Sequence, residues 1–286
     1  MSTTNELVIC VFGLQRSGNH AIISWILDNF PGSRVHLNDI RRIDPYLDFN
    51  GMTIHGLSYY TCHRKWHGVN RYIFSRRQFN GQRVGRVDDV HARFDIARIK
   101  LAHKDLLVLS YEDVFLNDPR VHRFLPNATK YIGKSGRQLR VLLLRDPYNH
   151  LASVLQHDAA YESASHFTSK LYVDMWKQYA RAFANGSPLL EGESVCINFN
   201  RWCDSSEYRR QLAQTIGFST DGKSFNVVSS VGGGSSFQGV IGDARDLGVG
   251  ERWRVYKDNP LYSSLFDDEI VEYAERLFNM RHDAIF

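Results

Sequence analysis

The clearest pattern along the chain is a set of short apolar runs that alternate with stretches of helical periodicity. The runs at residues 7–12, 106–109 and 141–144 contain no polar residue, which is typical of strands buried on both faces of a sheet. Residues 195–199, Val-Cys-Ile-Asn-Phe, are a further plausible strand late in the chain. Strands that alternate with helices predict a parallel α/β sheet with right-handed crossovers.

The stretches between these runs have the features of helices. Apolar residues recur on one helical stripe between residues 22 and 30, and Pro31 and Gly32 mark its end. Asp146 is a good N-cap, and Pro147 is a natural first residue of a helix that reaches about residue 157. Further helices are expected at residues 165–184, 208–216 and 267–280.

Residues 41–100 lack this regularity. Aromatic, histidine and basic residues are mixed there with glycines, so we interpret the region as an irregular insertion or cap rather than as core sheet. No repeat, low-complexity tract or linker divides the chain. Residues 1–286 are therefore expected to form a single domain that ends in a glycine-rich loop and a helix at 231–286.

Composition and apolar patterning bear on the cellular location of the protein and on the ligands it can bind. The net charge of +4 fits anionic ligands but is too small to indicate nucleic-acid binding. No apolar stretch approaches the ~20 residues that span a bilayer. The run at 7–14 lacks the basic flank and cleavage site of a signal peptide, and the four cysteines form no disulfide framework. We expect a cytoplasmic protein with no membrane span.

A glycine loop after the first apolar run is the strongest candidate site. Gly13 and Gly18 have the spacing G-x-x-x-x-G of a phosphate-binding P-loop. A nucleotide triphosphatase continues with Lys and then Ser or Thr, which reach the phosphates and Mg²⁺, but this chain has Asn19 and His20 there. Arg16 places a fixed positive charge inside the loop instead. The loop is expected to hold a phosphate group, but not a Mg-bound triphosphate.

Three physical features favour anion binding by this loop. It follows a buried strand, it precedes a helix N-terminus with partial positive charge, and its glycines let backbone N–H groups converge. Arg16 adds a bidentate, charge-assisted donor, and Ser17, Asn19 and His20 add further donors. The alternative is a strand-to-helix turn that needs glycine for its geometry alone.

A second candidate site combines Arg145 and Ser153. Arg145 follows a buried strand, at the end of a parallel sheet where ligands bind. Ser153 lies about two turns into the next helix, on the face that carries His150. The alternatives are an ordinary salt bridge of Arg145 with Asp146 or Glu112, and a small residue at a helix contact for Ser153.

Together the two sites resemble the sulfotransferase family. Residues 15–20, Gln-Arg-Ser-Gly-Asn-His, resemble its 5′-phosphosulfate loop, P-K-S-G-T-T, and carbohydrate-acting members often have R-S-G-S-S. The segment from Arg145 to Ser153 is similar to its 3′-phosphate motif, an Arg and a Ser eight positions apart. A loose likeness continues to the C-terminal glycine-rich loop and Arg-Trp at residues 252–253.

The resemblance implies a fold, a reaction and a set of residues. The fold would be a three-layer α/β sandwich with a central parallel sheet, like that of P-loop NTPases. The chain would transfer a sulfuryl group from 3′-phosphoadenosine 5′-phosphosulfate (PAPS), without a metal, to a hydroxyl of a carbohydrate or other small polar acceptor. The residues implied in PAPS binding are Arg16, Ser17, Gly18, Asn19, His20, Arg145 and Ser153.

The resemblance also implies catalytic roles. Arg16 would stabilise charge on the leaving group, and His20 stands where the family has Thr. The general base is a His or Glu in the family, and the corresponding place after residues 106–109 makes Glu112 the first candidate and Asp113 the second. His20 and histidines of the insertion (His55, His63 and His67) stay possible bases, and Arg245 or Arg252 is the candidate C-terminal basic element.

Other hypotheses remain open at this point. An atypical P-loop kinase or NTPase would need the Lys and Ser or Thr that are missing after Gly18. A non-catalytic nucleotide-binding relative would keep the loop and lose turnover. A metal site of Cys62 with His55, His63 and His67 fits no standard zinc spacing, because Cys62 and His63 are adjacent.

Overall fold

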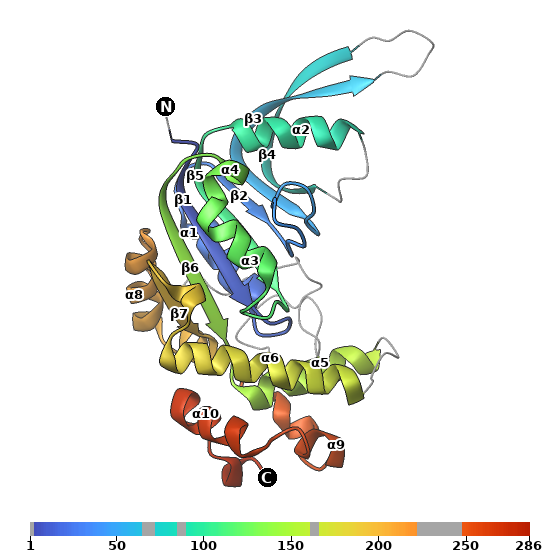
Figure 1. Cartoon of the computed structure of the whole chain (residues 1–286), viewed down its shortest axis with the longest axis vertical. Helices are drawn as coiled ribbons and strands as arrows, with labels where there is room; N and C mark the ends of the chain where they lie inside the picture. The colour runs from blue at the N-terminus through green and yellow to red at the C-terminus, as the bar shows by residue number, and fades with distance from the viewer. Residues whose placement is uncertain (1–2, 65–71, 85–89, 161–165, 222–247) are drawn as a thin grey trace. The chain divides into compact units, whose positions relative to one another are not determined.

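The fold is an α/β architecture with a mostly parallel central sheet flanked by helices (Figure 1). The computed structural model describes residues 3–64, 72–84, 90–160, 166–221 and 248–286. The strands are β1 (Asn5–Gly13), β2 (Arg34–Leu37), β3 (Met52–Arg64), β4 (Tyr72–Val84), β5 (Lys104–Glu112), β6 (Ser135–Leu144) and β7 (Ser194–Asn198). Their order in the sheet is β4-β3-β2-β5-β1-β6-β7. Strands β2 and β5 pair in parallel, which fits the predicted parallel sheet, although the sequence pattern did not predict β2 itself.

Helices occupy most of the chain between and after the strands. The longer helices are α1 (Asn19–Asn29), α2 (Val90–Leu101), α5 (Pro147–Ala160), α6 (His166–Asn185), α8 (Ser206–Ile216) and α10 (Asp268–Phe278). The shorter helices are α3 (Pro119–Phe124), α4 (Ala128–Ile132), α7 (Phe199–Asp204) and α9 (Pro260–Ser263), with 3₁₀ turns η1 (Leu125–Asn127), η2 (Pro188–Leu190), η4 (Arg252–Val255) and η5 (His282–Ala284). No described helix is long and apolar enough to cross a membrane.

The chain folds into two compact units, each built from several segments. Unit 1 contains residues 1–11, 30–112 and 117–140, and unit 2 contains residues 12–29, 113–116 and 141–286. The prediction of a single domain over 1–286 stays a prediction.

The sequence had suggested that residues 41–100 are irregular, but the described part of this range contains β3, β4 and α2. Strands β3 and β4 form a long antiparallel pair, β3 also pairs with β2, and α2 follows. The pairing register shifts between His55 and Ser58, where Gly56 has φ +68°, which marks a β-bulge. Antiparallel strands at the edge of a sheet need no continuous apolar run. This is why the mixed polar and aromatic pattern did not reveal them.

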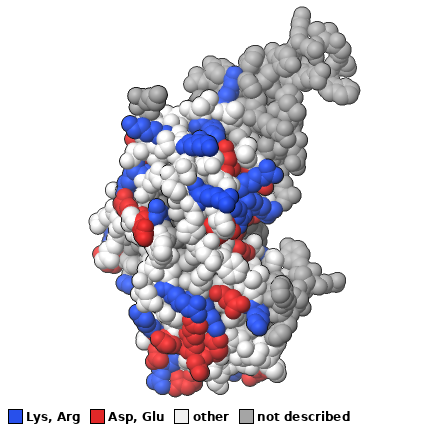
Figure 2. All heavy atoms as spheres, viewed as in Figure 1, with Lys and Arg blue, Asp and Glu red and all other residues white. Residues whose placement is uncertain are grey.

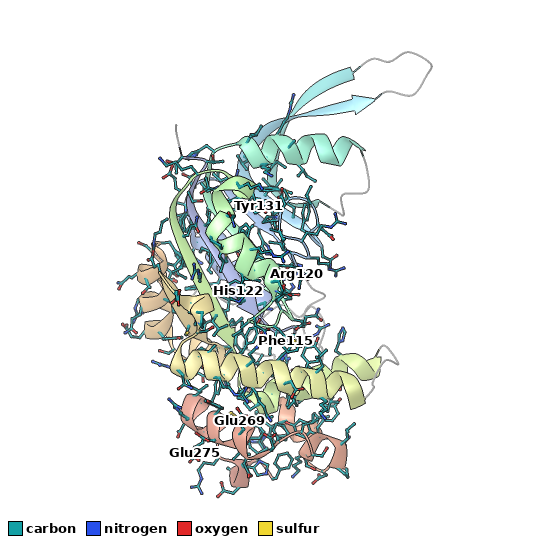
Figure 3. All side chains as sticks on the ribbon, viewed as in Figure 1. Phe115, Arg120, His122, Tyr131, Glu269 and Glu275 are labelled. Atoms are coloured by element: carbon teal, nitrogen blue, oxygen red, sulfur yellow. The ribbon has the colours of Figure 1, made fainter. Side chains whose placement is uncertain are left out.

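Unit 2 confirms the predicted helices. Asp146 caps α5 as expected, since its Oδ1 accepts the N–H of Asn149 at 2.8 Å. The apolar face of α6 is buried through Trp176 and Tyr179, both with no exposed surface. On the outer face of α6, Figure 2 shows basic and acidic side chains close together with those of α10. Arg181 of α6 pairs there with Glu269 of α10, which Figure 3 labels.

Candidate functional site

The glycine loop lies between β1 and α1 in unit 2, and its shape depends on close contacts. A Cβ on Gly13 would lie 1.9 Å from Oδ1 of Asn19, so only glycine fits there. The Asn19 side chain donates through Nδ2 to the Leu14 carbonyl at 3.1 Å. The Ser17 hydroxyl donates to the same carbonyl at 2.5 Å.

The side chains of Ser17 and Asn19 have a structural task inside the loop, and their predicted contact with a bound anion stays a prediction. The sequence assigned their side-chain donors to the bound anion, but the structure turns both donors into the loop. Ser17 is 1% exposed and Asn19 is 4% exposed. Both residues brace the loop from inside, because a tight turn leaves the Leu14 carbonyl as their nearest acceptor.

Two residues of the loop have left-handed backbone conformations. Arg16 has φ +65° and Gly18 has φ +99°. Left-handed residues within a turn bring successive N–H groups to one side, which is how backbone nests hold anions. The ring of Phe199, the first residue of α7, fills the space beside Gly18, where a Cβ would approach it to 2.1 Å. Nothing in the sequence pattern marks Phe199 for this packing role.

Arg145, Ser153 and Arg252 form the second part of the site, and we call them the arginine–serine cluster. Arg145 Nη1 donates to Ser153 Oγ at 3.3 Å and to the Arg16 carbonyl at 3.1 Å. Arg252 Nη1 donates to the same Ser153 Oγ at 2.9 Å. The cluster thus joins the end of β6, the middle of α5 and the start of η4, and through Arg16 it touches the glycine loop.

Asn149 holds Arg252 in the cluster. Its Oδ1 accepts the backbone N–H of Arg252 at 2.8 Å, and its Nδ2 donates to the Gly250 carbonyl at 3.1 Å. The Asn149 side chain is fixed in turn by Asp146, the N-cap of α5. Sequence reasoning missed Asn149, although it lies four residues before Ser153 and therefore on the same helical face.

The cluster concentrates buried positive charge. Arg145 is 2% exposed and Arg252 is 8% exposed. Burial, together with the charges of Arg145 and Arg16, lowers the pKa of Arg252 to about 9, so it stays protonated at neutral pH. The hydrogen-bond acceptors of Arg145 are neutral oxygens of Arg16, Ser153 and Val249. An anion bound beside these arginines would relieve their mutual repulsion.

The alternative role for Arg145 was a salt bridge with Asp146 or Glu112. The described hydrogen bonds of Arg145 go to neutral oxygens instead. The Asp146 carboxylate accepts hydrogen bonds from Asn149 and Asn200, while Arg145 bonds to neutral oxygens. Phe199 also lies under the Arg145 guanidinium, 5.5 Å from the ring centroid. A buried arginine held by neutral partners and an aromatic ring can present its charge to a ligand.

The candidate general bases Glu112, Asp113 and His20 differ in their position and in their hydrogen-bond partners. Glu112 ends β5 in unit 1 and is half-buried. Asp113, in unit 2, has φ +52° and accepts the Gln15 N–H at 2.8 Å and the Tyr172 hydroxyl at 2.8 Å. His20 is half-buried in the first turn of α1.

The remaining candidates lie elsewhere or outside the described residues. His55 belongs to β3 in unit 1. The side chain of His63, all of His67 and Arg245, and the glycine-rich loop at 232–237 lie outside the described residues. Within the described part of the chain, no group of three or more His, Cys, Asp or Glu residues has the arrangement of a metal site.

Comparison with protein-family models, with curated proteins and with solved structures finds no match.

Proposed function

We propose that the chain is a sulfotransferase that transfers a sulfuryl group from PAPS to a hydroxyl of a carbohydrate or other small polar acceptor. The observation that carries the proposal is the arginine–serine cluster: Arg145 and Arg252 share the Ser153 hydroxyl, and Arg145 also binds the carbonyl of Arg16. Two phosphate-type sites, one made of loop backbone and one of arginines, suit a nucleotide with phosphates at both its 5′ and 3′ positions.

The α/β architecture supports the further proposal of a P-loop NTPase-like sulfotransferase fold. The central sheet is mostly parallel and flanked by helices, and the glycine loop follows β1 directly. We also keep the expectations of a cytoplasmic location and of a metal-free reaction as parts of this proposal.

The proposed reaction gives each residue a task. The acceptor oxygen forms a bond to sulfur while the bond from sulfur to the bridging 5′-phosphate oxygen breaks. The acceptor proton passes to the general base, and adenosine 3′,5′-bisphosphate leaves. Arg16 and the backbone N–H groups of the loop stabilise the charge that develops on this leaving group, which is where most of the rate gain in such transfers arises.

Calorimetry with adenosine 3′,5′-bisphosphate is the first test, because it needs no knowledge of the acceptor. Folded protein should bind this ligand without added Mg²⁺, and incubation with PAPS and a panel of sugars should release it. If the folded protein does not bind adenosine 3′,5′-bisphosphate, the proposal is wrong. Binding without turnover on any acceptor would favour the non-catalytic relative, and Mg²⁺-dependent ATP turnover would favour the kinase or NTPase.

Glu112 remains the proposed general base, and an isosteric variant tests it. Glu112→Gln should keep the affinity for adenosine 3′,5′-bisphosphate and lower turnover about 100-fold or more, as loss of a general base does. A full rate in this variant would exclude the assignment and move attention to His20.

A further inference from the structure

The backbone of Gln15, just before Arg16, is held on both sides by side chains of other segments. Its N–H donates to Asp113 Oδ1 at 2.8 Å, and its carbonyl accepts a hydrogen bond from His150 Nε2 at 2.8 Å. A carbonyl oxygen can only accept, so Nε2 of His150 carries the proton. The N–H belongs to the peptide group between Leu14 and Gln15, and the carbonyl belongs to the one between Gln15 and Arg16, so each of these two consecutive peptide groups is fixed by one hydrogen bond.

Tyr172 of α6 joins the two holding groups. Its hydroxyl donates to Asp113 Oδ2 at 2.8 Å. Its ring meets the His150 ring edge to face, with centroids 6.1 Å apart and planes at 77°. Asp113, Tyr172 and His150 therefore form a continuous set around the Gln15 backbone, and we call these three residues the Gln15 latch.

His150 is suited to a fixed role. Burial lowers the pKa of His150 to about 4, so the ring is neutral at neutral pH and keeps one N–H. The second nitrogen, Nδ1, is buried and has no hydrogen-bond partner in the described part of the chain. The described contacts therefore direct this imidazole to the Gln15 carbonyl.

The Gln15 latch lies next to Arg16, whose backbone conformation is energetically unfavourable. Arg16 adopts φ +65°, a conformation that costs a residue other than glycine roughly 1–2 kcal/mol. The carbonyls on both sides of this bend are taken by donors, Gln15 by His150 and Arg16 by Arg145. Carbonyl oxygens repel an anion, so turning both toward fixed donors favours a loop that offers N–H groups and the Arg16 charge to the ligand.

We propose that Asp113, Tyr172 and His150 are positioning residues that preorganise the glycine loop for the 5′-phosphate end of the nucleotide. This inference rests on the proposed function for the identity of its ligand. It also changes the role of Asp113. Both carboxylate oxygens accept hydrogen bonds from Gln15 and Tyr172, so Asp113 holds the loop rather than taking a proton from the acceptor.

A pair of tyrosines on α6 provides a matched test. Tyr172→Phe removes the hydroxyl bonded to Asp113, whereas Tyr179→Phe removes a hydroxyl that donates to the Val114 carbonyl at 2.9 Å. Each variant loses one hydroxyl that donates to the segment 113–116, from a half-buried side chain in Tyr172 and from a buried one in Tyr179. Tyr172→Phe should weaken binding of adenosine 3′,5′-bisphosphate about tenfold, and Tyr179→Phe should leave it within twofold.

The choice of ligand locates the effect. Adenosine 3′-monophosphate lacks the 5′-phosphate and should lose less than twofold in Tyr172→Phe. An equal loss for both ligands would mean that the variant damages unit 2 in general, and would overturn the inference. His150 offers a rescue series: His150→Leu should behave as Tyr172→Phe does, while His150→Gln, which keeps an N–H donor near the Nε2 position, should recover most of the affinity.

Amide hydrogen exchange separates this inference from the proposed function. The Gln15 N–H should exchange faster in Tyr172→Phe than in Tyr179→Phe, with no ligand present. If the wild-type protein binds neither nucleotide, the proposed function fails, while faster exchange still supports the latch. If the Gln15 exchange rate is the same in the two variants, the latch is wrong whatever the protein binds.

Discussion

The two regions of unit 2 that we propose to bind the nucleotide are built in different ways. The glycine loop uses backbone groups, with left-handed residues at Arg16 and Gly18 and no room for a side chain at Gly13. The arginine–serine cluster uses side chains, and two buried guanidinium groups meet at one hydroxyl. The loop therefore depends on shape, whereas the cluster depends on charge.

This difference predicts how each region fails. A change in the loop that alters the backbone should cost stability first, because the conformation itself is at risk. A change in the cluster that removes charge should cost affinity first, because the cluster gathers cations that repel one another and the proposed anionic ligand would offset this repulsion. Substitutions in each region should separate the two costs.

Removal of Arg145 should have the largest effect on affinity. Arg145→Ala deletes the donors to Ser153 and to the Arg16 carbonyl, together with a buried positive charge. Hydrogen bonds to charged groups contribute about 1.5–3 kcal/mol each, so affinity for adenosine 3′,5′-bisphosphate should fall at least about 100-fold by calorimetry. Arg145→Lys should recover little, because one ammonium cannot reach separate acceptors. Near-normal affinity in Arg145→Ala would remove the cluster from the binding site.

Gly18→Ala should show the dependence of the loop on shape. Its new Cβ would lie 2.1 Å from the Phe199 ring, at a residue with φ +99°. Strain and overpacking together should lower the free energy of unfolding by about 3 kcal/mol in chemical denaturation. Gly186→Ala is the control, since Gly186 also has a left-handed φ of +80° but nothing within 4 Å of the added Cβ. Equal losses in the two variants would show that contact with Phe199 is unimportant.

His150 predicts a pH dependence of stability. Burial lowers its pKa from 6.5 to about 4, the charge of Arg145 adds to this effect, and the bond to Gln15 opposes it. Between pH 6.5, the pKa of His150 in the unfolded chain, and about pH 4, its pKa in the folded protein, the unfolded chain binds more protons. The free energy of unfolding therefore falls as the pH falls through this range. From pH 7 to pH 5 the contribution of His150 to the loss is about 2 kcal/mol. Between pH 7 and pH 5 the free energy of unfolding, measured by chemical denaturation, should therefore fall by about 2 kcal/mol less in His150→Gln than in the wild-type protein. An equal fall in both proteins would refute the lowered pKa of His150.

The sequence predicted the parts of the fold that burial controls. Strands β1, β5 and β6 have apolar runs because both their faces are covered, and α5 follows its cap and proline signals. The sequence did not predict the antiparallel pair of β3 and β4, because antiparallel strands need no such run. Nothing local in the sequence distinguishes such a strand from a loop with aromatic residues.

In the candidate site, too, local sequence patterns indicated some residues and missed others. Arg145 and Ser153 were found because they follow a buried strand at a recognisable spacing, and the structure brings them together. The contacts of Asn149 with Arg252, of Asp113 with Gln15 and of Phe199 with Gly18 join residues that are far apart in the chain. Tertiary packing creates these pairs, so no local pattern could indicate them.

The smallest expected effect separates shape from charge at a single residue. Arg16→Ala and Arg16→Gly both remove the charge, but only glycine relieves the left-handed backbone at φ +65°. Arg16→Gly should therefore be more stable than Arg16→Ala by about 1 kcal/mol in chemical denaturation, while the two bind adenosine 3′,5′-bisphosphate equally weakly. If the glycine variant bound tightly, the Arg16 charge would have no role and the backbone of the loop would be sufficient. If both variants were equally stable, the Gln15 latch would not be holding Arg16 against an unfavourable conformation.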